Sequence, residues 1–295
     1  MDTNEDIIIF WFRQDLRIVD NPGLSKSLKS DKVLPIYILD DTNSNDFAMG
    51  AASRWWLHNS LRELNKNLDN KLSLHKGDPL EILESLSSRF NIKGIFWNRC
   101  YEPWRIERDK KIKSKFIEKD IIVETFNSAL LWEPWEILKS DNTPYKVFTP
   151  YYRKGCLMSE APRKPLSAPN LNTLFEDKEN ILQLDDLNLL PRIKWYKEME
   201  KLWEPGEKGA HKKLESFLSD GLLGYKEGRN FPSKKNVSQL SAHMHFGEIS
   251  PNQVWHRAKL KKDLPRIEKD LDHFLSELGW REFSYNLLFH FPELP

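Results

Sequence analysis

The first part of the chain alternates short, continuous apolar runs with longer segments in which apolar residues recur at helical spacing. The runs are too short for helices and rich in β-branched and aromatic residues, a pattern typical of buried parallel strands. They predict strands at residues 7–12, 33–39, 72–75, 94–97 and 121–123. Strands that alternate with helices predict a doubly wound parallel sheet, so we expect a Rossmann-like α/β domain at the N-terminus.

Capping residues and the spacing of leucines indicate where the helices between these strands begin and which of their faces are buried. Asn21-Pro22 predicts a helix over about 22–29 and Asp78-Pro79 predicts another, because each pair supplies an N-cap and a first-turn proline. A further helix is marked by leucines on one face: Leu57, Leu61, Leu64 and Leu68. The segment 13–17, which follows the first strand, has no glycine, so we do not expect a nicotinamide dinucleotide site there.

The pattern changes in the second half of the chain. Prolines, Asn and Asp clusters and weak periodicity indicate a long connection that wraps the surface. From Pro205 onward the apolar residues follow helical spacing without clear strands. We therefore expect an α/β domain over 1–135, an inter-domain connector over 136–204 and an all-α domain over 205–295.

Composition narrows the classes of protein. A net charge of +1 means that any nucleic-acid surface must be a local patch. Two cysteines cannot form a Cys-rich metal site, and His243 and His245 have no third metal ligand close by in the sequence. No apolar run approaches the roughly 20 residues that span a bilayer. With no charged-then-apolar leader at Met1, the default is a soluble protein of a reducing compartment such as the cytoplasm. We expect neither a metal nor a membrane as a partner, and we also expect a monomer.

The last segment has the most informative side chains. At helical spacing Glu277, Trp280 and Arg281 are neighbours beside an apolar stripe, a face that suits a large planar ligand. The alternative is an amphipathic helix in which Glu277 and Arg281 form an i,i+4 ion pair worth a few tenths of a kcal/mol. Eleven tryptophans are spread over both halves, and rings with a polar group also stack on bases and isoalloxazines.

Several collinear motifs together resemble the photolyase/cryptochrome family, most closely its bacterial cyclobutane pyrimidine dimer photolyases. These are the segments Phe12 to Arg17 with Asp20-Asn21, Tyr145 to Pro150, Gly221 to Pro232, Leu240 to Pro251 and Glu277 to Phe283. The resemblance covers nearly the whole chain. It implies an α/β antenna domain followed by a helical FAD-binding domain.

The resemblance also implies a role for each matching residue around the flavin. It makes Tyr225 a flavin contact and Arg229 the DNA-side arginine. The segment that wraps the FAD phosphates comprises Val237, Ser238, Gln239, Leu240 and Ser241. Val237 stands where a threonine is common, and ordinary N-capping is the alternative role for the two serines.

On the last helix, the resemblance makes Glu277 the carboxyl that faces the flipped pyrimidines and a neighbour of the cofactor. Trp280 corresponds to the ring that packs on the lesion, and Arg281 to a flavin contact. Phe274 stands where a tryptophan is frequent near the flavin. Glu277 and Trp280 are therefore the expected catalytic residues, and Arg229 and Trp280 the expected DNA contacts.

A second chromophore is implied at the segment that follows the fourth strand. Tyr101 and Glu102 fall where many relatives bind a folate, and these side chains suit stacking on a pterin and accepting its hydrogen bonds. The expected antenna is a reduced folate, 5,10-methenyltetrahydrofolate, with a deazaflavin as the alternative. A strand-end aromatic residue and acid with a structural role in the βα loop are the other interpretation.

The implied activity is light-driven repair of cyclobutane pyrimidine dimers in UV-damaged DNA, a carbon–carbon lyase reaction. Excited, reduced FAD gives an electron to a flipped-out dimer, the ring splits and the electron returns. A cryptochrome-type blue-light photoreceptor and a 6-4 photoproduct photolyase are the alternatives. Family members continue well beyond the match to Pro295, so we expect a C-terminally truncated chain that binds FAD weakly or not at all and does not repair DNA.

Overall fold

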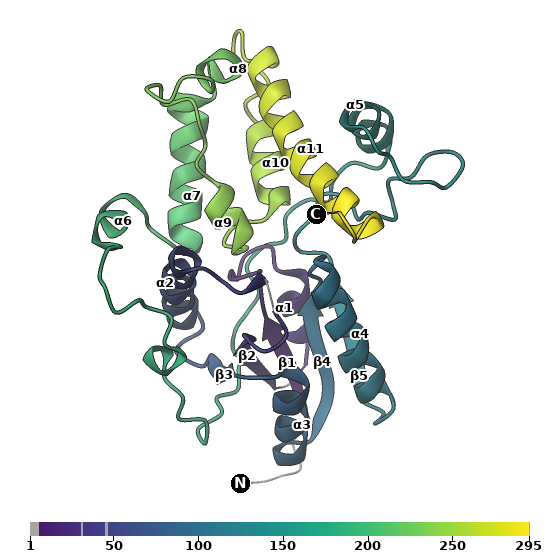
Figure 1. Ribbon diagram of the computed structural model, residues 1–295, viewed down its shortest axis with the longest axis vertical. Coiled ribbons are helices and arrows are strands. Elements are labelled where there is room, and N and C mark those ends of the chain that lie inside the picture. The colour runs from purple at the N-terminus through teal and green to yellow at the C-terminus, as the bar shows by residue number, and fades with distance from the viewer. Residues whose placement is uncertain (1–5, 31, 45–46, 295) are drawn as a thin grey trace.

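A five-stranded parallel sheet forms the N-terminal half of the molecule (Figure 1). The computed structural model describes residues 6–30, 32–44 and 47–294. The strands are β1 (Ile7–Phe12), β2 (Val33–Leu39), β3 (Ser73–Lys76), β4 (Ile92–Asn98) and β5 (Ile122–Phe126). They pair in the order β3-β2-β1-β4-β5, and every neighbouring pair is parallel. The predicted doubly wound sheet is confirmed.

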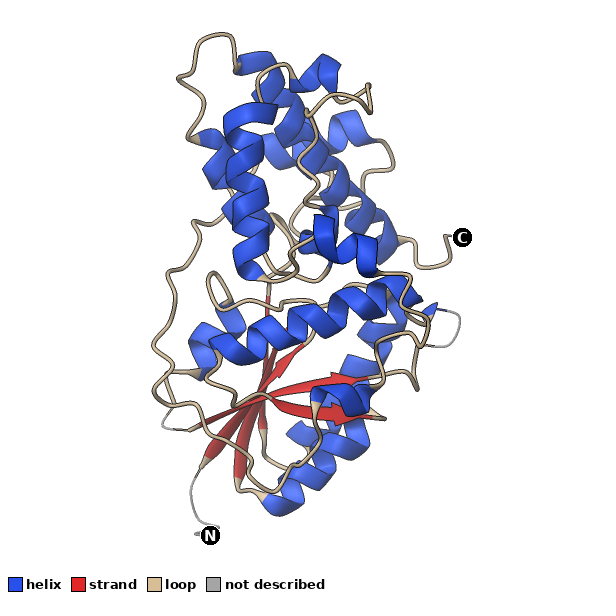
Figure 2. Ribbon diagram, turned by 90° about the vertical axis from the view of Figure 1, so that its left-hand side faces the viewer, coloured by secondary structure: helices blue, strands red, loops and turns tan. Residues whose placement is uncertain are grey.

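Helices cover both faces of this sheet (Figure 2). The helices are α1 (Pro22–Ser27), α2 (Ala51–Asn67), α3 (Pro79–Arg89) and α4 (Pro103–Ile117). Successive residues of β1 point to opposite faces, so Phe10 packs with α1 and α2 whereas Ile9 packs with α3 and α4. Asn21 and Asp78 cap α1 and α3 as their sequences predict, because Asn21 accepts one backbone N–H of the first turn of α1 and Asp78 accepts two of α3.

The connection after the sheet lies along the surface and contains only short elements. These are α5 (Phe148–Pro150), the π-helical residues Tyr151–Gly155, the 3-10 turns Cys156–Met158 and Leu184–Leu187, and α6 (Lys197–Leu202). Near its middle, the backbone N–H of Val33 donates to Thr173 and that of Phe175 donates to Val33. The connection is thereby held against the start of β2.

The C-terminal part is helical and lies over the carboxyl ends of the strands (Figure 1). It contains α7 (Glu207–Ser216), the π-helical residues Phe217–Gly221, α8 (Tyr225–Gly228), α9 (Ser241–His245), α10 (Pro251–Lys259) and α11 (Glu268–His290). Their apolar faces share one core with the aromatic residues that follow α5. None of the helices in the described residues is both long and apolar enough to cross a membrane.

Buried polar contacts join the helical part to the sheet. The indole of Trp56 in α2 donates to Glu248, and Arg17 donates to the carbonyl oxygen of Gly247 at 2.9 Å. Gly247 has φ of +67°, and a Cβ there would lie only 2.5 Å from Asp15 Cα, so this position needs glycine on both grounds. The backbone of the segment after β1 thus packs directly on the turn after α9.

Candidate functional site

Four of the predicted flavin-side and DNA-side residues meet where α8 packs against α11. Tyr225 is buried, and its ring lies edge-on to Phe274 with 5.5 Å between centroids. The guanidinium of Arg229, one turn further along, lies 5.4 Å from the Tyr225 ring centroid. Glu277, one turn after Phe274, forms an ion pair with Arg229. The structure therefore brings together residues separated by about fifty positions in the sequence.

The electrostatics of this group are set by the Arg229–Glu277 pair. The hydrogen bond that Arg229 donates to Glu277 raises the pKa of Arg229, and burial raises the pKa of Tyr225. His273 Nε2 lies 3.7 Å from the same carboxylate. Glu277 side-chain exposure is 30%, so the acid is screened from solvent yet remains open to a ligand.

Arg281 has other partners than Glu277. Its Nη1 donates to the carbonyl oxygen of Ala129 at 2.7 Å and to Glu282 at 3.1 Å. The i,i+4 pair that the amphipathic alternative requires is therefore replaced by a pair between α8 and α11. Arg281 connects α11 to the loop after β5.

Trp280 lies one turn from Glu277 and is 45% exposed. Its ring stacks on Phe148 with 3.7 Å between centroids and 12° between planes. An exposed indole beside a carboxylate offers a stacking surface and a hydrogen-bond acceptor to the same planar group.

The segment 237–241 forms a loop before α9. Gln239 has φ of +53° and accepts a hydrogen bond from Lys213 at 2.7 Å. Leu240 is buried and precedes the first residue of α9, which has no side-chain cap, so neither Ser238 nor Ser241 caps this helix. Asn236 donates to the carbonyl oxygens of Gly221 and Leu223, and these bonds tie the loop to the segment that carries Tyr225.

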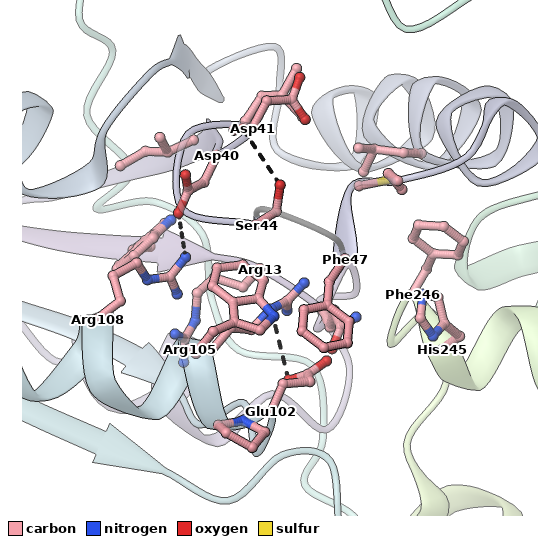
Figure 3. Close-up of a pocket in the computed structure, with 18 of the residues that line it drawn as sticks. Arg13, Asp40, Asp41, Ser44, Phe47, Glu102, Arg105, Arg108, His245 and Phe246 are labelled. Carbon is pink, nitrogen blue, oxygen red and sulfur yellow. Dashed lines mark hydrogen bonds and ion pairs between the residues drawn. The ribbon is translucent and has the colours of Figure 1, made fainter. Parts of the chain in front are cut away.

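A cavity of about 610 Å³ opens at the carboxyl ends of β1 and β2 (Figure 3). Its lining includes three arginines, three carboxylates and several aromatic rings: Arg13, Arg105, Arg108, Asp40, Asp41, Glu102, Trp11, Trp104, Tyr37, Phe47 and Phe246. The lining arginines and acids are equal in number, so a ligand would meet little net charge.

Most of these charges are already paired around the cavity. Arg108 donates to Asp40 at 2.9 Å, and its guanidinium lies 4.9 Å from the Trp11 ring centroid. Arg105 lies 3.8 Å from Glu102, whose Oε2 is buried without a hydrogen-bond partner. Glu102 thus carries a buried acceptor that has no hydrogen-bond donor among the described residues.

Of the two predicted antenna residues, Glu102 lines the cavity and Tyr101 does not. The Tyr101 ring is buried, and its hydroxyl donates to Glu133 at 3.0 Å. Burial, and next the charge of Glu133, raise the pKa of Tyr101. Arg99 also pairs with Glu133 at 2.5 Å, so Tyr101 belongs to a network behind the cavity wall.

Several cavity residues were not among the predicted site residues. Arg13 and the pair Asp40-Asp41 directly follow the first two strands, and polar residues at neighbouring strand ends are a usable signal. Trp104 and Arg108 had no such signal, because α4 buries only Ile112 and Phe116 and its helical pattern is weak. Helix α4 itself was not predicted.

The two candidate metal-binding histidines have different surroundings. His243 is buried, with Nδ1 2.5 Å from Glu248, whereas His245 lines the cavity. Within residues 6–30, 32–44 and 47–294, no group of three or more His, Cys, Asp or Glu side chains is arranged to hold a metal ion.

Comparison with known proteins assigns the chain to a class. Residues 8–170 match the family described as DNA photolyase. A relative from Agrobacterium fabrum, named deoxyribodipyrimidine photo-lyase, is 38% identical over 97% of this chain and 60% of its own length. Cryptochrome-2 of Arabidopsis thaliana is 32% identical over 96% of this chain and 49% of its own length.

The fold comparison agrees with the sequence comparison. The crystal structure of a bacterial class III photolyase from Agrobacterium tumefaciens superposes with a TM-score of 0.90 at 37% identity, over 99% of this chain and 61% of that one. A doubly wound sheet followed by a helical unit is thus the architecture of this class. The chain belongs to the DNA photolyase family. It spans about 60% of the length of the photolyases that it matches.

Proposed function

We propose that the protein in its whole length repairs cyclobutane pyrimidine dimers in DNA, using blue light and reduced FAD. The observation that carries this proposal is the Arg229–Glu277 pair on Tyr225, with the exposed indole of Trp280 one turn away. Together these groups offer an acceptor, a cation and a stacking ring to an extruded base pair. A protein that only senses light does not need such a lesion-facing set.

The residues present fit an FAD molecule. The rings of Tyr225 and Phe274 offer apolar contact, and Arg229 offers positive charge. The hydroxyls of Ser238 and Ser241, which are not used to cap α9, suit phosphate oxygens. When bound, FAD supplies the light-driven electron that opens the dimer.

Each protein group contributes binding and orientation. Extruding two bases from a duplex costs a few kcal/mol, and less for a lesion that stacks poorly. Stacking on Trp280 offsets this cost, at about 1–3 kcal/mol for each base. Glu277 accepts hydrogen bonds from the N–H groups of the pyrimidines, and Arg229 holds Glu277 in position while it offers its remaining donors to the DNA backbone.

The test uses the natural full-length protein loaded with FAD and an oligonucleotide that contains one dimer. Glu277→Ala is compared with Glu268→Ala, which removes an exposed carboxylate from the first turn of the same helix. We expect light-dependent loss of dimers in the wild type and in the Glu268 variant. The Glu277 variant should keep its flavin absorbance and repair about tenfold more slowly or worse, because a charged hydrogen bond is lost.

Two results would redirect the proposal. Bound flavin without light-dependent loss of dimers in the wild type favours a cryptochrome-type photoreceptor, which the 32% identity to a plant cryptochrome keeps as the second candidate. Repair of a matched oligonucleotide that carries one 6-4 photoproduct, without repair of the cyclobutane dimer, favours the other class of photolyase.

For the antenna we propose a reduced folate, 5,10-methenyltetrahydrofolate, in the 610 Å³ cavity, with a deazaflavin as the alternative. The Oε2 of Glu102, which has no hydrogen-bond partner, suits a pterin N–H donor, and Trp104 offers a ring. We expect Glu102→Gln and Trp104→Ala to lose folate on gel filtration. Tyr101→Phe should retain it, because that hydroxyl faces Glu133. Retention of a deazaflavin and not of folate would select the alternative.

The domain bounds, the oligomeric state and the cellular compartment are further proposals that rest on the same family membership. We propose an antenna domain over 1–135, a connector over 136–204 and the start of a FAD-binding domain over 205–295. We further propose a monomer in the bacterial cytoplasm, where Cys100 and Cys156 remain the free, buried thiols that the structure shows.

A further inference from the structure

Three aromatic rings stack from the core of the helical part to its surface. Tyr152 is 8% exposed, and Phe148 lies over it with 5.5 Å between centroids and 10° between planes. Trp280 in turn lies over Phe148 at 3.7 Å and 12° and is 45% exposed. Phe148 is therefore held between a buried ring and an exposed one.

The inner end of this stack is fixed by the backbone of α11. A Cβ at Gly279 would come within 2.6 Å of Tyr152 Cε2, so the tyrosine ring packs against a helix surface that only glycine provides. Tyr152 also belongs to the shared apolar core of the helical part. The ring of Tyr152 thus has little freedom to move. Phe148 and Trp280, which stack on it in turn, are therefore held nearly parallel to its plane.

The outer end is fixed from a second side. Phe283, which is buried, lies edge-on to Trp280 at 6.0 Å and 75° and edge-on to Phe148 at 6.0 Å and 65°. One face of the indole is covered by Phe148 and one edge by Phe283. The exposed area of Trp280 therefore belongs mainly to the indole face opposite Phe148 and to the edge away from Phe283.

We propose that Phe148 is a positioning residue that orients Trp280 and leaves one indole face open for an extruded pyrimidine. This inference rests on the proposed function, since it deepens the role of Trp280 there. A base can stack only on the face opposite Phe148, so the side from which a flipped base enters is set by the first residue of α5. Because the ring is already in position, binding loses less side-chain freedom.

The test separates action through Trp280 from a general structural role. Phe148→Leu removes the flat ring but keeps an apolar side chain, and Phe148→Tyr restores the ring. In the dark, we expect Phe148→Leu to bind dimer-containing DNA about three- to tenfold more weakly, the range expected for one lost aromatic contact. Affinity for the undamaged oligonucleotide should not change, and Phe148→Tyr should bind like the wild type.

A double-mutant cycle gives the decisive readout. Trp280→Ala combined with Phe148→Leu should bind damaged DNA no more weakly than Trp280→Ala alone. Additive losses would overturn the proposal, because Phe148 would then act independently of the indole. Equal affinity of Phe148→Leu and wild type would overturn it as well.

A DNA-free measurement distinguishes failure of this inference from failure of the proposed function. The near-UV circular dichroism of Trp280 is the difference between the wild type and Trp280→Ala, and we expect this signal to shrink in the Phe148→Leu background. An unchanged signal refutes the positioning role whatever the DNA result. If the wild type binds damaged and undamaged DNA equally, the proposed function and the base-stacking role of Trp280 are both refuted. The near-UV dichroism of Trp280 then still decides whether Phe148 orients the indole.

Discussion

Glu282 provides the sharpest quantitative prediction, because it is a buried carboxylate between the two halves of the molecule. It lies on α11 and is 1% exposed. Its Oε2 accepts hydrogen bonds from the backbone N–H groups of Leu131 at 2.7 Å and Trp132 at 3.3 Å, and its Oε1 accepts one from Arg281 at 3.1 Å. Burial outweighs these contacts and raises the pKa of Glu282 to about 7.

The sign of the pH dependence follows from this raised pKa. Between the ordinary value of 4.5 and about 7, the folded protein holds a proton at Glu282 that the unfolded chain has released. The free energy of unfolding therefore falls as pH rises through this window. At about 1.4 kcal/mol per pH unit, the full effect is about 3 kcal/mol, of which about 2 kcal/mol falls between pH values of about 5.5 and 8.

The assay is urea unfolding of the wild type and Glu282→Gln at those two pH values. Glutamine keeps the shape and one carbonyl acceptor but does not titrate. We expect the wild type to lose about 2 kcal/mol more than the variant between the lower and the higher pH. Other groups, including His75 with its lowered pKa, titrate in both proteins and cancel in the difference. Parallel pH dependences of the two proteins would refute the reasoning.

Two other substitutions test the packing and the joint between the halves. Gly279→Ala should lower the free energy of unfolding by about 1–3 kcal/mol in urea titrations, because the added Cβ meets the ring of Tyr152; an unchanged midpoint would mean that the ring moves freely. Asp20→Ala should cost about 3 kcal/mol in the same assay, because the backbone N–H of Leu166 and the hydroxyl of Ser250 both donate to this buried carboxylate. Stability like that of the wild type would show that water replaces those bonds.

Local patterns in the sequence determined the elements of the α/β half. The predicted bounds of β1 and β2 are those of the structure, because central parallel strands are buried on both faces and therefore appear as unbroken apolar runs. Asn21 and Asp78 specify the starts of α1 and α3, because a cap depends only on residues within one turn. The motifs of the last helix likewise pointed to the residues that pack around Tyr225.

Tertiary structure alone decided which of these side chains meet. Glu277 has Arg281 at helical spacing, yet it pairs with Arg229 of another helix, and Arg281 contacts a loop of the α/β half. Tyr101 and Glu102 are adjacent in sequence, but one is buried behind a wall that the other lines. Phe148 gave no local sign that it would stack on Trp280. A strand, a cap or a helical face depends on neighbours along the chain, whereas an ion pair, a cavity or a ring stack depends on how distant segments pack, and a short sequence window does not contain that information.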